Sequence, residues 1–440
     1  MSELPETNST PPAGDIARLA EHLFRHEAGK LVSVLTGIFG IERLQLAEDV
    51  VQEALIRALQ AWPYYGIPKN PAAWLTQTAK NLAVDVIRRE KSFHEKQPQI
   101  AAFIEQWSGE CNAEDSPSLE HEIKDTRLRM MFACCHPLIP PEAQTVLALK
   151  TLCGFNPAEI AKAFLTTEAA IAKRLVRARQ KIREQKIPFE IPTGAELAGR
   201  LDVVLQTLYL LFNEGYKASS GESLVRADLC EEAIRLATLL AEQPAGQEPR
   251  THALLALMLF SAARLPARTD DDGHLLRLKD QDRSTWNKEK MARGMYHLAQ
   301  SATGEELTAY HLQAAIAACH CAAPDYAATD WPRILSLYDR LAELDDSPIV
   351  ALNRAVALAH VHGPQAGIEA VVAIQHQPAL ASYYLLYAVR AEFEMQLENF
   401  DSAAAYLRKA MELAALKSEQ ALLARRLKEC EAQSVPACLS

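Results

Sequence analysis

The chain has 440 residues, of which 49% are hydrophobic and 23% are charged, and its formal net charge is −10. This length and composition predict a soluble globular protein of about two to four domains. No apolar run reaches the ~18 residues of a membrane-spanning helix, and the nine cysteines lack the spacing of a disulfide framework, so we expect a cytoplasmic chain without membrane association.

Glycine is scarce, Ala and Leu are abundant, and alternating Val/Ile runs are few, which predicts an all-α fold. Residues 1–192 contain 23 Lys+Arg and 24 Asp+Glu, whereas the whole chain contains 46 and 56. The acidic excess therefore falls mainly on the C-terminal part, and the N-terminal part can carry the basic patches that nucleic-acid binding requires.

Residues 1–14 are polar and rich in Pro and Thr, and they lack the basic and apolar segments of a signal peptide. We expect a disordered lead-in there, followed by a helical domain at residues 15–96.

The first informative helix of this domain is predicted at residues 47–62. One of its faces carries a buried stripe at helical spacing, made of Val51, Ala54, Leu55, Ala58 and Trp62. The opposite face carries four residues at i, i+3, i+4 and i+7: Asp49, Gln52, Glu53 and Ile56. An isoleucine among acidic and amide groups suggests a docking surface for another protein. A solvated face with one stray isoleucine is the alternative.

The segment 62–74 is predicted to be a loop, because it contains two prolines and a glycine within a few residues. Tyr64 and Tyr65 lie in it near Lys69, and aromatic rings beside a cation suit stacking on unpaired bases. Alternatively, the two tyrosines fold back over the core.

Asn70 and Pro71 indicate the start of the next helix, as N-cap and first helical residue. Its apolar side is predicted from four residues at helical spacing: Leu75, Ala79, Leu82 and Val86. Another side combines an aromatic ring, amides, a hydroxyl and two arginines, which together can contact bases and phosphates. Its members are Trp74, Gln77, Thr78, Asn81, Asp85, Arg88 and Arg89.

Residues 97–120 contain prolines and many acidic residues without a helical stripe, and we interpret them as an acidic linker.

Residues 121–187 are predicted to contain a helix-turn-helix. Asn156 caps its first helix, with Glu159 three residues later as in a capping box. Residues 165–167 form the turn, and Thr167 can cap the second helix.

The second helix of this motif buries Ile171, Leu175, Ala178 and Ile182 at helical spacing. Small residues at its N-terminal end and basic residues along its open face suit insertion into the DNA major groove. The candidate DNA-binding residues are Thr167, Glu168, Ala170, Lys173, Arg174, Arg177 and Lys181. A basic surface helix without DNA contacts is the alternative.

Together these segments resemble the sigma-70 superfamily, specifically its small extracytoplasmic-function type, over about residues 15–187. AEDVVQEALIRALQAW (47–62) resembles the region 2 helix that grips the polymerase clamp, and NPAAWLTQTAKNLAVDVIRREK (70–91) resembles the helix that handles the −10 element. Residues 140–184 resemble region 4, which reads the −35 element. The resemblance implies promoter DNA and core RNA polymerase as partners, the latter contacted through its clamp helices and a region 4 docking site.

A connector with Pro188 and Pro192 leads to an Ala/Leu-rich helical tail, residues 195–440. Segments that begin at Asn353 and Val389 align at a spacing of 36 residues, near the tetratricopeptide period, although generic helical hairpins would look similar. Residues 208–221 and 270–287 resemble a sigma factor subgroup with a tetratricopeptide-like extension, which is thought to regulate the sigma core in place of a separate anti-sigma protein.

We find no P-loop, dinucleotide fingerprint or nucleophile elbow, and therefore expect no catalytic residue and no cofactor. The runs 134–136 (Cys-Cys-His) and 319–321 (Cys-His-Cys) are weak zinc candidates, because neighbouring residues on a helix diverge by about 100°. We expect no metal site.

A dense charged cluster near Asp270–Trp286, with Arg264, Arg268, Asp282 and Arg283, is either an ion-paired scaffold or a ligand-sensing pocket.

The leading hypothesis is therefore a sigma factor, and the alternative is a helix-turn-helix transcriptional regulator with a helical sensor domain. A tetratricopeptide-type scaffold or enzyme with a vestigial N-terminus is a third reading. The acidic tail is a candidate for an intramolecular contact with the sigma core, either masking the basic helix 173–186 or holding the two sigma domains in a productive arrangement. A chain truncated at Thr193 would distinguish the two.

Overall fold

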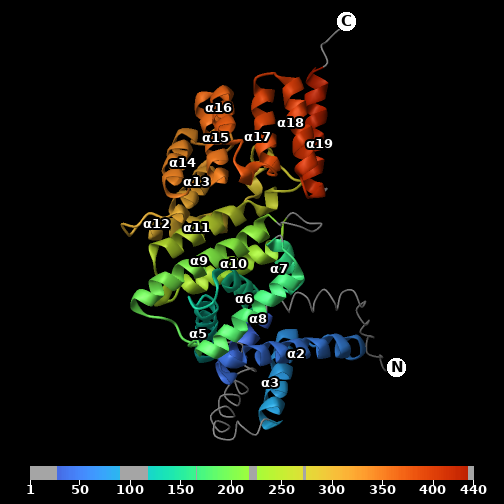
Figure 1. The fold of residues 1–440 in the computed structure, drawn as a ribbon, viewed down its shortest axis with the longest axis vertical. Coiled ribbons are helices and arrows are strands. Elements are labelled where there is room, and N and C mark those ends of the chain that lie inside the picture. Colours follow the sequence, from blue (N-terminus) through green and yellow to red (C-terminus); the bar gives the residue numbers. More distant parts are fainter. Residues whose placement is uncertain (1–26, 90–116, 165, 218–224, 271–273, 435–440) are drawn as a thin grey trace, which may run out of the picture. The chain divides into compact units, whose positions relative to one another are not determined.

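The computed structural model describes residues 27–89, 117–164, 166–217, 225–270 and 274–434. Within these ranges the regular structure is helical, with one isolated antiparallel bridge between Thr269 and Leu275 (Figure 1). The predicted all-α class is thereby confirmed. No helix in the described part is long and apolar enough to cross a membrane.

The chain divides into two compact units, which we call the N-terminal unit (Met1–Thr207) and the C-terminal unit (Leu208–Ser440). The division falls inside helix α9 (Gly194–Tyr216). Thr207 Oγ1 lies 3.5 Å from Oγ1 of Thr145 and 3.9 Å from the sulfur of Cys135. The first part of α9 therefore contributes to the core of the N-terminal unit. The domain limits predicted from the sequence, including a tail that starts at residue 195, remain predictions.

The first helices of the N-terminal unit are residues 27–39, η1 (Ile41–Arg43), α2 (Leu44–Tyr65) and α3 (Pro71–Arg89). The whole predicted stripe of α2 is buried, which confirms the helical spacing: Val51, Ala54, Leu55, Ala58 and Trp62. Trp62 meets the ring of Trp74 edge to face, with ring centroids 5.6 Å apart. This aromatic pair joins α2 to α3.

Helix α2 is longer than predicted. Pro63 lies inside it and the helix continues to Tyr65, so the predicted loop at residues 62–74 shrinks to residues 66–70. Near the C-terminal end Pro63 removes a single N–H donor, and the fixed φ of its ring still suits a helix. Gly66 then ends the helix with a φ of 79°, a conformation that favours glycine.

The remaining helices of the N-terminal unit before α9 are α5 (Pro117–Cys134), α6 (Pro141–Cys153), α7 (Pro157–Ala163) and α8 (Glu168–Gln185). Most of the predicted linker at 97–120 lies outside the described residues. Asn156 Oδ1 accepts the backbone N–H of Glu159 at 2.8 Å, and Glu159 Oε2 accepts the N–H of Asn156 at 2.9 Å. The capping box that begins the helix-turn-helix is therefore confirmed.

Helix α8 begins and packs as predicted. Thr167 Oγ1 accepts the backbone N–H of Ala170 at 3.2 Å, which caps the helix. The apolar stripe is buried in full: Ile171, Leu175, Ala178 and Ile182. A helix-turn-helix thus lies between residues 156 and 185.

The C-terminal unit is built from packed helices that follow one another along the chain (Figure 1). They are α10 (Ala227–Ala241), α11 (Pro249–Ala263), α12 (Lys288–Ser301), α13 (Ala309–Ala322), α14 (Trp331–Leu344), α15 (Pro348–His362), α16 (Pro364–Ile374), α17 (Tyr384–Gln396), α18 (Phe400–Leu413) and α19 (Lys417–Ser434).

The repeat predicted in this unit is present as two helical hairpins, α15 with α16 and α17 with α18. Helix α17 begins 36 residues after α15, and α18 begins 36 residues after α16. The helices cross closely at Gly367, where an added Cβ would lie 2.7 Å from Ala359 Cβ and from the ring of Phe393. A glycine at this position is what allows the second helix of the first hairpin to pack so tightly.

Part of the charged cluster predicted near residues 270–286 is a scaffold. One guanidinium nitrogen of Arg283 donates to the carbonyl oxygens of His320 at 2.6 Å and Ala323 at 2.7 Å, at the C-terminal end of α13. Arg283 also lies over the ring of Trp286, 4.9 Å from its centroid, and Trp286 is 3% exposed. These contacts hold the segment before α12 against α13.

His320 should make the stability of the C-terminal unit depend on pH. Burial lowers the pKa of His320 to about 3, with further contributions from the charges of Arg264, Arg283 and His360. A histidine whose pKa is depressed in the folded state contributes full stability above its unfolded pKa of about 6.5, and this stability is lost as the pH falls towards 3. We expect urea denaturation to give a falling unfolding free energy between pH 6.5 and 4.

In the His320→Leu variant this fall should be less steep, because the group that takes up the proton on unfolding has been removed. His362→Leu, at an exposed position on α15, is the matched control and should leave the slope unchanged. Equal slopes in all three proteins would contradict the role of His320.

Candidate nucleic-acid interface

The open face of α8 is basic and accessible. Lys173 and Arg177 are exposed, whereas Arg174 and Lys181 are half-buried. At the N-terminal end Glu168 is exposed and Ala170 is half-buried, while the Thr167 side chain is used as the cap. Ala170 and the four basic residues thus share one side of α8, away from its buried stripe, whereas Thr167 and Glu168 lie at its N-terminal end.

On helix α3, several of the side chains predicted to contact DNA are half-buried or take part in hydrogen bonds within the helix. Asn70 Oδ1 accepts the backbone N–H of Ala73 at 3.0 Å and so caps the helix. Gln77 donates to Asn81 Oδ1 at 3.1 Å, and both are exposed. Thr78 and Trp74 are half-buried, and the side chains of Arg88 and Arg89 lie outside the described residues.

Tyr64 and Tyr65 stand out at the C-terminal end of α2. They are 84% and 90% exposed, and the neighbouring Lys69 is exposed as well. The alternative in which these rings cover the core is therefore wrong. Two solvent-facing phenol rings, followed in the chain by an exposed lysine, form a surface on which unpaired bases can stack.

The polar face of α2 is exposed as predicted, with Asp49, Gln52 and Ile56 on the surface. Glu53 pairs with Arg57 at 3.0 Å. Ile56 is 47% exposed, and Leu59, one turn further on, is 44% exposed. Leu59 was missed in the sequence, although its i+3 spacing from Ile56 is a readable signal. The two side chains form an apolar patch on an otherwise polar face.

Comparison with known proteins connects these surfaces to a family. Residues 23–93 match sigma-70 region 2, residues 129–182 match sigma-70 region 4, and residues 200–302 match a family of unknown function (DUF6596). The two sigma regions cover α2 and α3 and the helix-turn-helix, in the same order as in the sequence prediction. The chain belongs to the sigma-70 family.

Three relatives extend this assignment. An uncharacterised protein of Rhizobium meliloti is 37% identical over 391 residues, which are 89% of this chain and 91% of the relative. The probable RNA polymerase sigma factor RfaY of Xanthomonas campestris is 28% identical over 32% of this chain and 34% of the relative. The ECF RNA polymerase sigma factor SigW of Bacillus subtilis is 24% identical over 32% of this chain and 74% of the relative.

The protein is thus a promoter-directing sigma factor of the extracytoplasmic-function type with a C-terminal extension. Sigma factors are non-enzymatic regulators that work with core RNA polymerase on promoter DNA, and this description applies to the two sigma-70 regions matched here. The match to region 2 favours a sigma factor over a plain helix-turn-helix regulator, because the latter needs only a DNA-binding domain and its sensor.

In this sigma factor a buried ion pair joins region 2 to region 4. The guanidinium of Arg179 on α8 donates to Glu48 Oε2 on α2, and Thr151 Oγ1 donates to Glu48 Oε1 at 3.3 Å. Burial raises the pKa of Glu48, opposed by the charges of Arg179 and Lys150. The sequence carried no signal for this pair, because its two members are 131 residues apart.

Two adjacent thiols of this sigma factor, those of Cys134 and Cys135, are not arranged for chemistry. Cys134 and Cys135 are fully buried, and burial raises the pKa of Cys135 to about 12. Both thiols therefore stay protonated and poorly nucleophilic at neutral pH. In the part of the chain that the structure describes, no three His, Cys, Asp or Glu side chains are grouped as metal ligands.

Proposed function

We propose that this sigma factor binds core RNA polymerase through the polar face of α2 and promoter DNA through α3 and α8. The supporting observation is that the α2 face is exposed and polar yet carries the apolar pair Ile56 and Leu59. Apolar side chains in the centre of a polar surface are typical of protein interfaces. The proposed polymerase-binding residues are Asp49, Gln52, Glu53 and Ile56, with Leu59 added from the structure.

Region 2 captures the unpaired bases of the −10 element in this proposal. Tyr64 and Tyr65 supply stacking surfaces, and the exposed amides of Gln77 and Asn81 supply hydrogen-bonding groups. Lys69 and the arginines that follow in α3 contribute positive charge for the phosphates. Asn70 and Trp74 act as positioning residues, since the first caps α3 and the second packs on Trp62.

Region 4 places α8 in the major groove at the −35 element. We expect Arg174→Ala and Arg177→Ala each to weaken promoter binding by about 1–3 kcal/mol, the usual contribution of an arginine to base discrimination. Fluorescence anisotropy with a promoter duplex and a −35-scrambled duplex would measure the effect. Each variant should lose more affinity for the promoter than for the scrambled sequence.

Arg183→Ala is the matched control for these variants, because Arg183 is exposed on α8 but faces away from the open basic side. It removes the same charge, and should weaken binding to both duplexes equally and slightly reduce the salt dependence. If Arg174→Ala and Arg177→Ala behave like Arg183→Ala, they contact phosphates and not bases.

Run-off transcription with purified core polymerase tests the whole proposal. The wild-type sigma factor should direct promoter-specific transcripts from a linear template, and the polymerase alone should not. A protein that binds the same DNA without directing transcription would instead be the helix-turn-helix regulator with a sensor domain.

The acidic C-terminal unit is proposed to regulate the sigma core through an intramolecular contact. The cut at Thr193 suggested by the sequence would remove α9, whose Thr207 contacts Thr145 and Cys135 in the N-terminal unit. A chain that ends at Thr207 retains these contacts. We expect its promoter-specific transcription to differ from that of the full chain.

Higher activity of this shortened chain would mean that the tail masks a DNA-binding or polymerase-binding surface. Lower activity would mean that the tail supports the active arrangement. Identical transcription at every promoter and salt concentration would contradict any action of the tail on the sigma core.

A further inference from the structure

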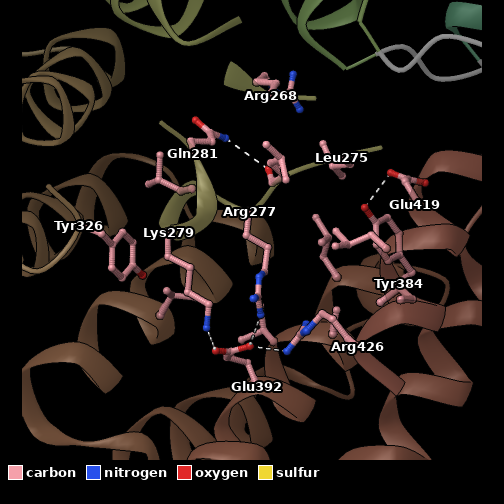
Figure 2. A pocket seen from close by; sticks show the side chains of 18 of the residues that line it. Arg268, Leu275, Arg277, Lys279, Gln281, Tyr326, Tyr384, Glu392, Glu419 and Arg426 are labelled. Atoms are coloured by element: carbon pink, nitrogen blue, oxygen red, sulfur yellow. Dashed lines mark hydrogen bonds and ion pairs between the residues drawn. The ribbon is translucent and has the colours of Figure 1, made fainter. Parts of the chain in front are cut away.

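The C-terminal unit contains a cavity of about 510 Å³ between the segment 275–281 and helices α15, α17 and α19 (Figure 2). Small-molecule sites in proteins usually measure about 300–1,000 Å³. Its walls include many aliphatic side chains, among them Leu275, Leu385, Val389 and Leu423. The cavity therefore has the size and the apolar lining of a small-molecule site.

The charged groups that line the cavity are mostly cationic. Six lysines and arginines face two carboxylates: Lys217, Arg264, Arg268, Arg277, Lys279 and Arg426 against Glu392 and Glu419. Positive charges taken out of water are costly unless counter-charges accompany them. The lining therefore has an excess of positive charge in a partly enclosed, apolar setting.

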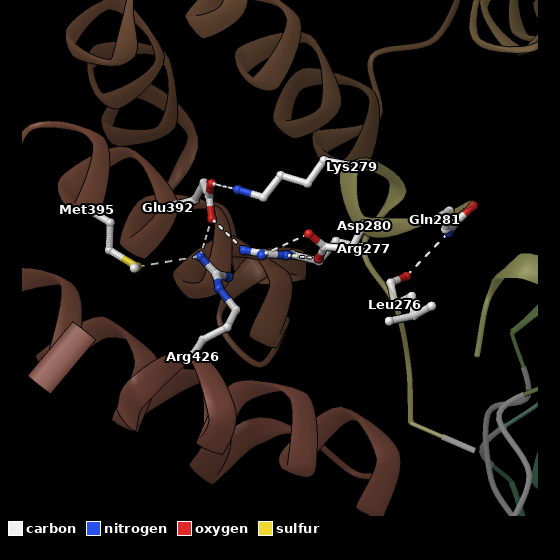
Figure 3. Close-up of polar contacts among 8 residues, drawn as sticks. All are labelled: Leu276, Arg277, Lys279, Asp280, Gln281, Glu392, Met395 and Arg426. Atoms are coloured by element: carbon white, nitrogen blue, oxygen red, sulfur yellow. Dashed lines mark hydrogen bonds and ion pairs between the residues drawn. The ribbon is translucent and has the colours of Figure 1, made fainter. Parts of the chain in front are cut away.

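Neither carboxylate is available to neutralise that excess. Glu392 already receives Lys279 Nζ at 2.8 Å, Arg277 at 3.5 Å and the guanidinium of Arg426 (Figure 3). Glu419 accepts the hydroxyl of Tyr384 at 2.7 Å and pairs with Lys217 Nζ at 3.1 Å. Both acids are therefore saturated by cations or donors of the cavity itself.

Two arginines are left without a carboxylate partner among the described residues. Arg268 is 9% exposed, donates to the carbonyl oxygen of Tyr216, and lies over that ring at 4.0 Å. Arg264 donates to the Tyr216 hydroxyl at 3.1 Å, and its Nε is buried without a hydrogen bond. Burial lowers the pKa of Arg268, and the charge of Arg264 also lowers it, so a counter-anion would relieve both effects.

A further buried donor in the lining is unsatisfied. Arg426 is 5% exposed, and its Nε has no hydrogen-bond partner in the described part. Figure 2 shows Arg268 at one end of the cavity and the Glu392 network at the other. The apolar walls lie between an end with uncompensated arginines and an end whose charges are paired.

We propose that this cavity binds a small organic anion, whose carboxylate or phosphate head meets Arg264 and Arg268 and whose apolar body lies against α17 and α19. Guanidinium groups bind both kinds of head through charge-assisted, often bidentate hydrogen bonds. The binding step does not depend on the proposed contacts with polymerase or DNA, so its test needs neither.

The test is a fluorescence titration of the full-length protein with 8-anilinonaphthalene-1-sulfonate, an apolar anion, followed by displacement. Octanoate and octyl phosphate represent the two heads, octan-1-ol provides the same chain without charge, and inorganic phosphate provides a head without a chain. We expect one or both charged amphiphiles to displace the dye at concentrations at least about tenfold below octan-1-ol. The better of the two identifies the head group.

Two variants locate the site. Arg268→Met should weaken displacement by at least about tenfold, and Val389→Trp should fill the apolar part while keeping all six cations. Arg408→Met is the control, because Arg408 forms an exposed pair with Glu431 away from the cavity. Circular dichroism checks that each variant is folded. If Arg268→Met does not fold, the location of the site is tested with Val389→Trp alone.

Equal displacement by octan-1-ol would overturn the proposal, since it would show an apolar site without anion recognition. Unchanged binding in folded Val389→Trp, or displacement by inorganic phosphate as strong as by octyl phosphate, would also overturn it. Loss of binding in the cavity variants, with Arg408→Met behaving as wild type, would support it.

Discussion

Replacing Ile56 by glutamate is expected to abolish co-purification of the sigma factor with core RNA polymerase. Ile56 is 47% exposed on α2, opposite the stripe that includes Ala54 and Leu55. A carboxylate there removes apolar contact area and adds a third acidic charge beside Asp49 and Glu53. Hot-spot residues near the centre of an interface contribute about 2 kcal/mol or more, so affinity should fall at least about 30-fold if Ile56 is one of them.

The fold should survive this substitution, because exposed positions usually change stability by no more than about 0.5 kcal/mol. Thermal unfolding of the variant measures this directly. Leu59→Glu should have the same effect on polymerase binding, whereas Val372→Glu makes a similar change at a residue 42% exposed on α16 and should have none. If Ile56→Glu unfolds the protein, Ile56 belongs to the core and not to a docking surface.

Replacing Arg179 by methionine is expected to lower the unfolding free energy of the N-terminal unit by about 3–5 kcal/mol. The change leaves Glu48, which is 4% exposed, buried without its cationic partner, and removing one member of a buried pair costs about that much. Urea denaturation followed by circular dichroism measures the loss. The double variant Glu48→Gln/Arg179→Met should lose less, because it no longer leaves the Glu48 carboxylate buried without Arg179.

Arg57→Met is the control, since it breaks an ion pair of the same kind on the same helix. Arg57 and Glu53 are both about half exposed, and such surface pairs contribute about 0–1 kcal/mol. If Arg179→Met costs no more than Arg57→Met, the pair between α2 and α8 does not stabilise the packing of region 2 on region 4.

The sequence alone was sufficient for the helical fold, the helix-turn-helix and the faces of α2 and α8. These features depend on residues three or four positions apart, on caps such as Asn156 and Thr167, and on family motifs within one segment. The residues assigned to the −10, −35 and polymerase contacts remain predictions, because no bound DNA or polymerase tests them. The predicted end of α2 was wrong. Pro63 suggested that the helix ends before it, but a proline is tolerated near the end of a helix, and α2 continues to Tyr65.

Only the tertiary structure revealed the buried pair of Glu48 and Arg179, and the cavity around Arg264 and Arg268. Both combine side chains that are far apart in the chain, and no local pattern indicates which distant groups will meet. The charged cluster near Asp270–Trp286 illustrates the difference. The sequence left an ion-paired scaffold and a ligand pocket as alternatives. In the structure Arg283 donates to the C-terminal end of α13, whereas Arg268 lines the cavity. The packing of the helices decides which groups a side chain meets and how deeply it is buried.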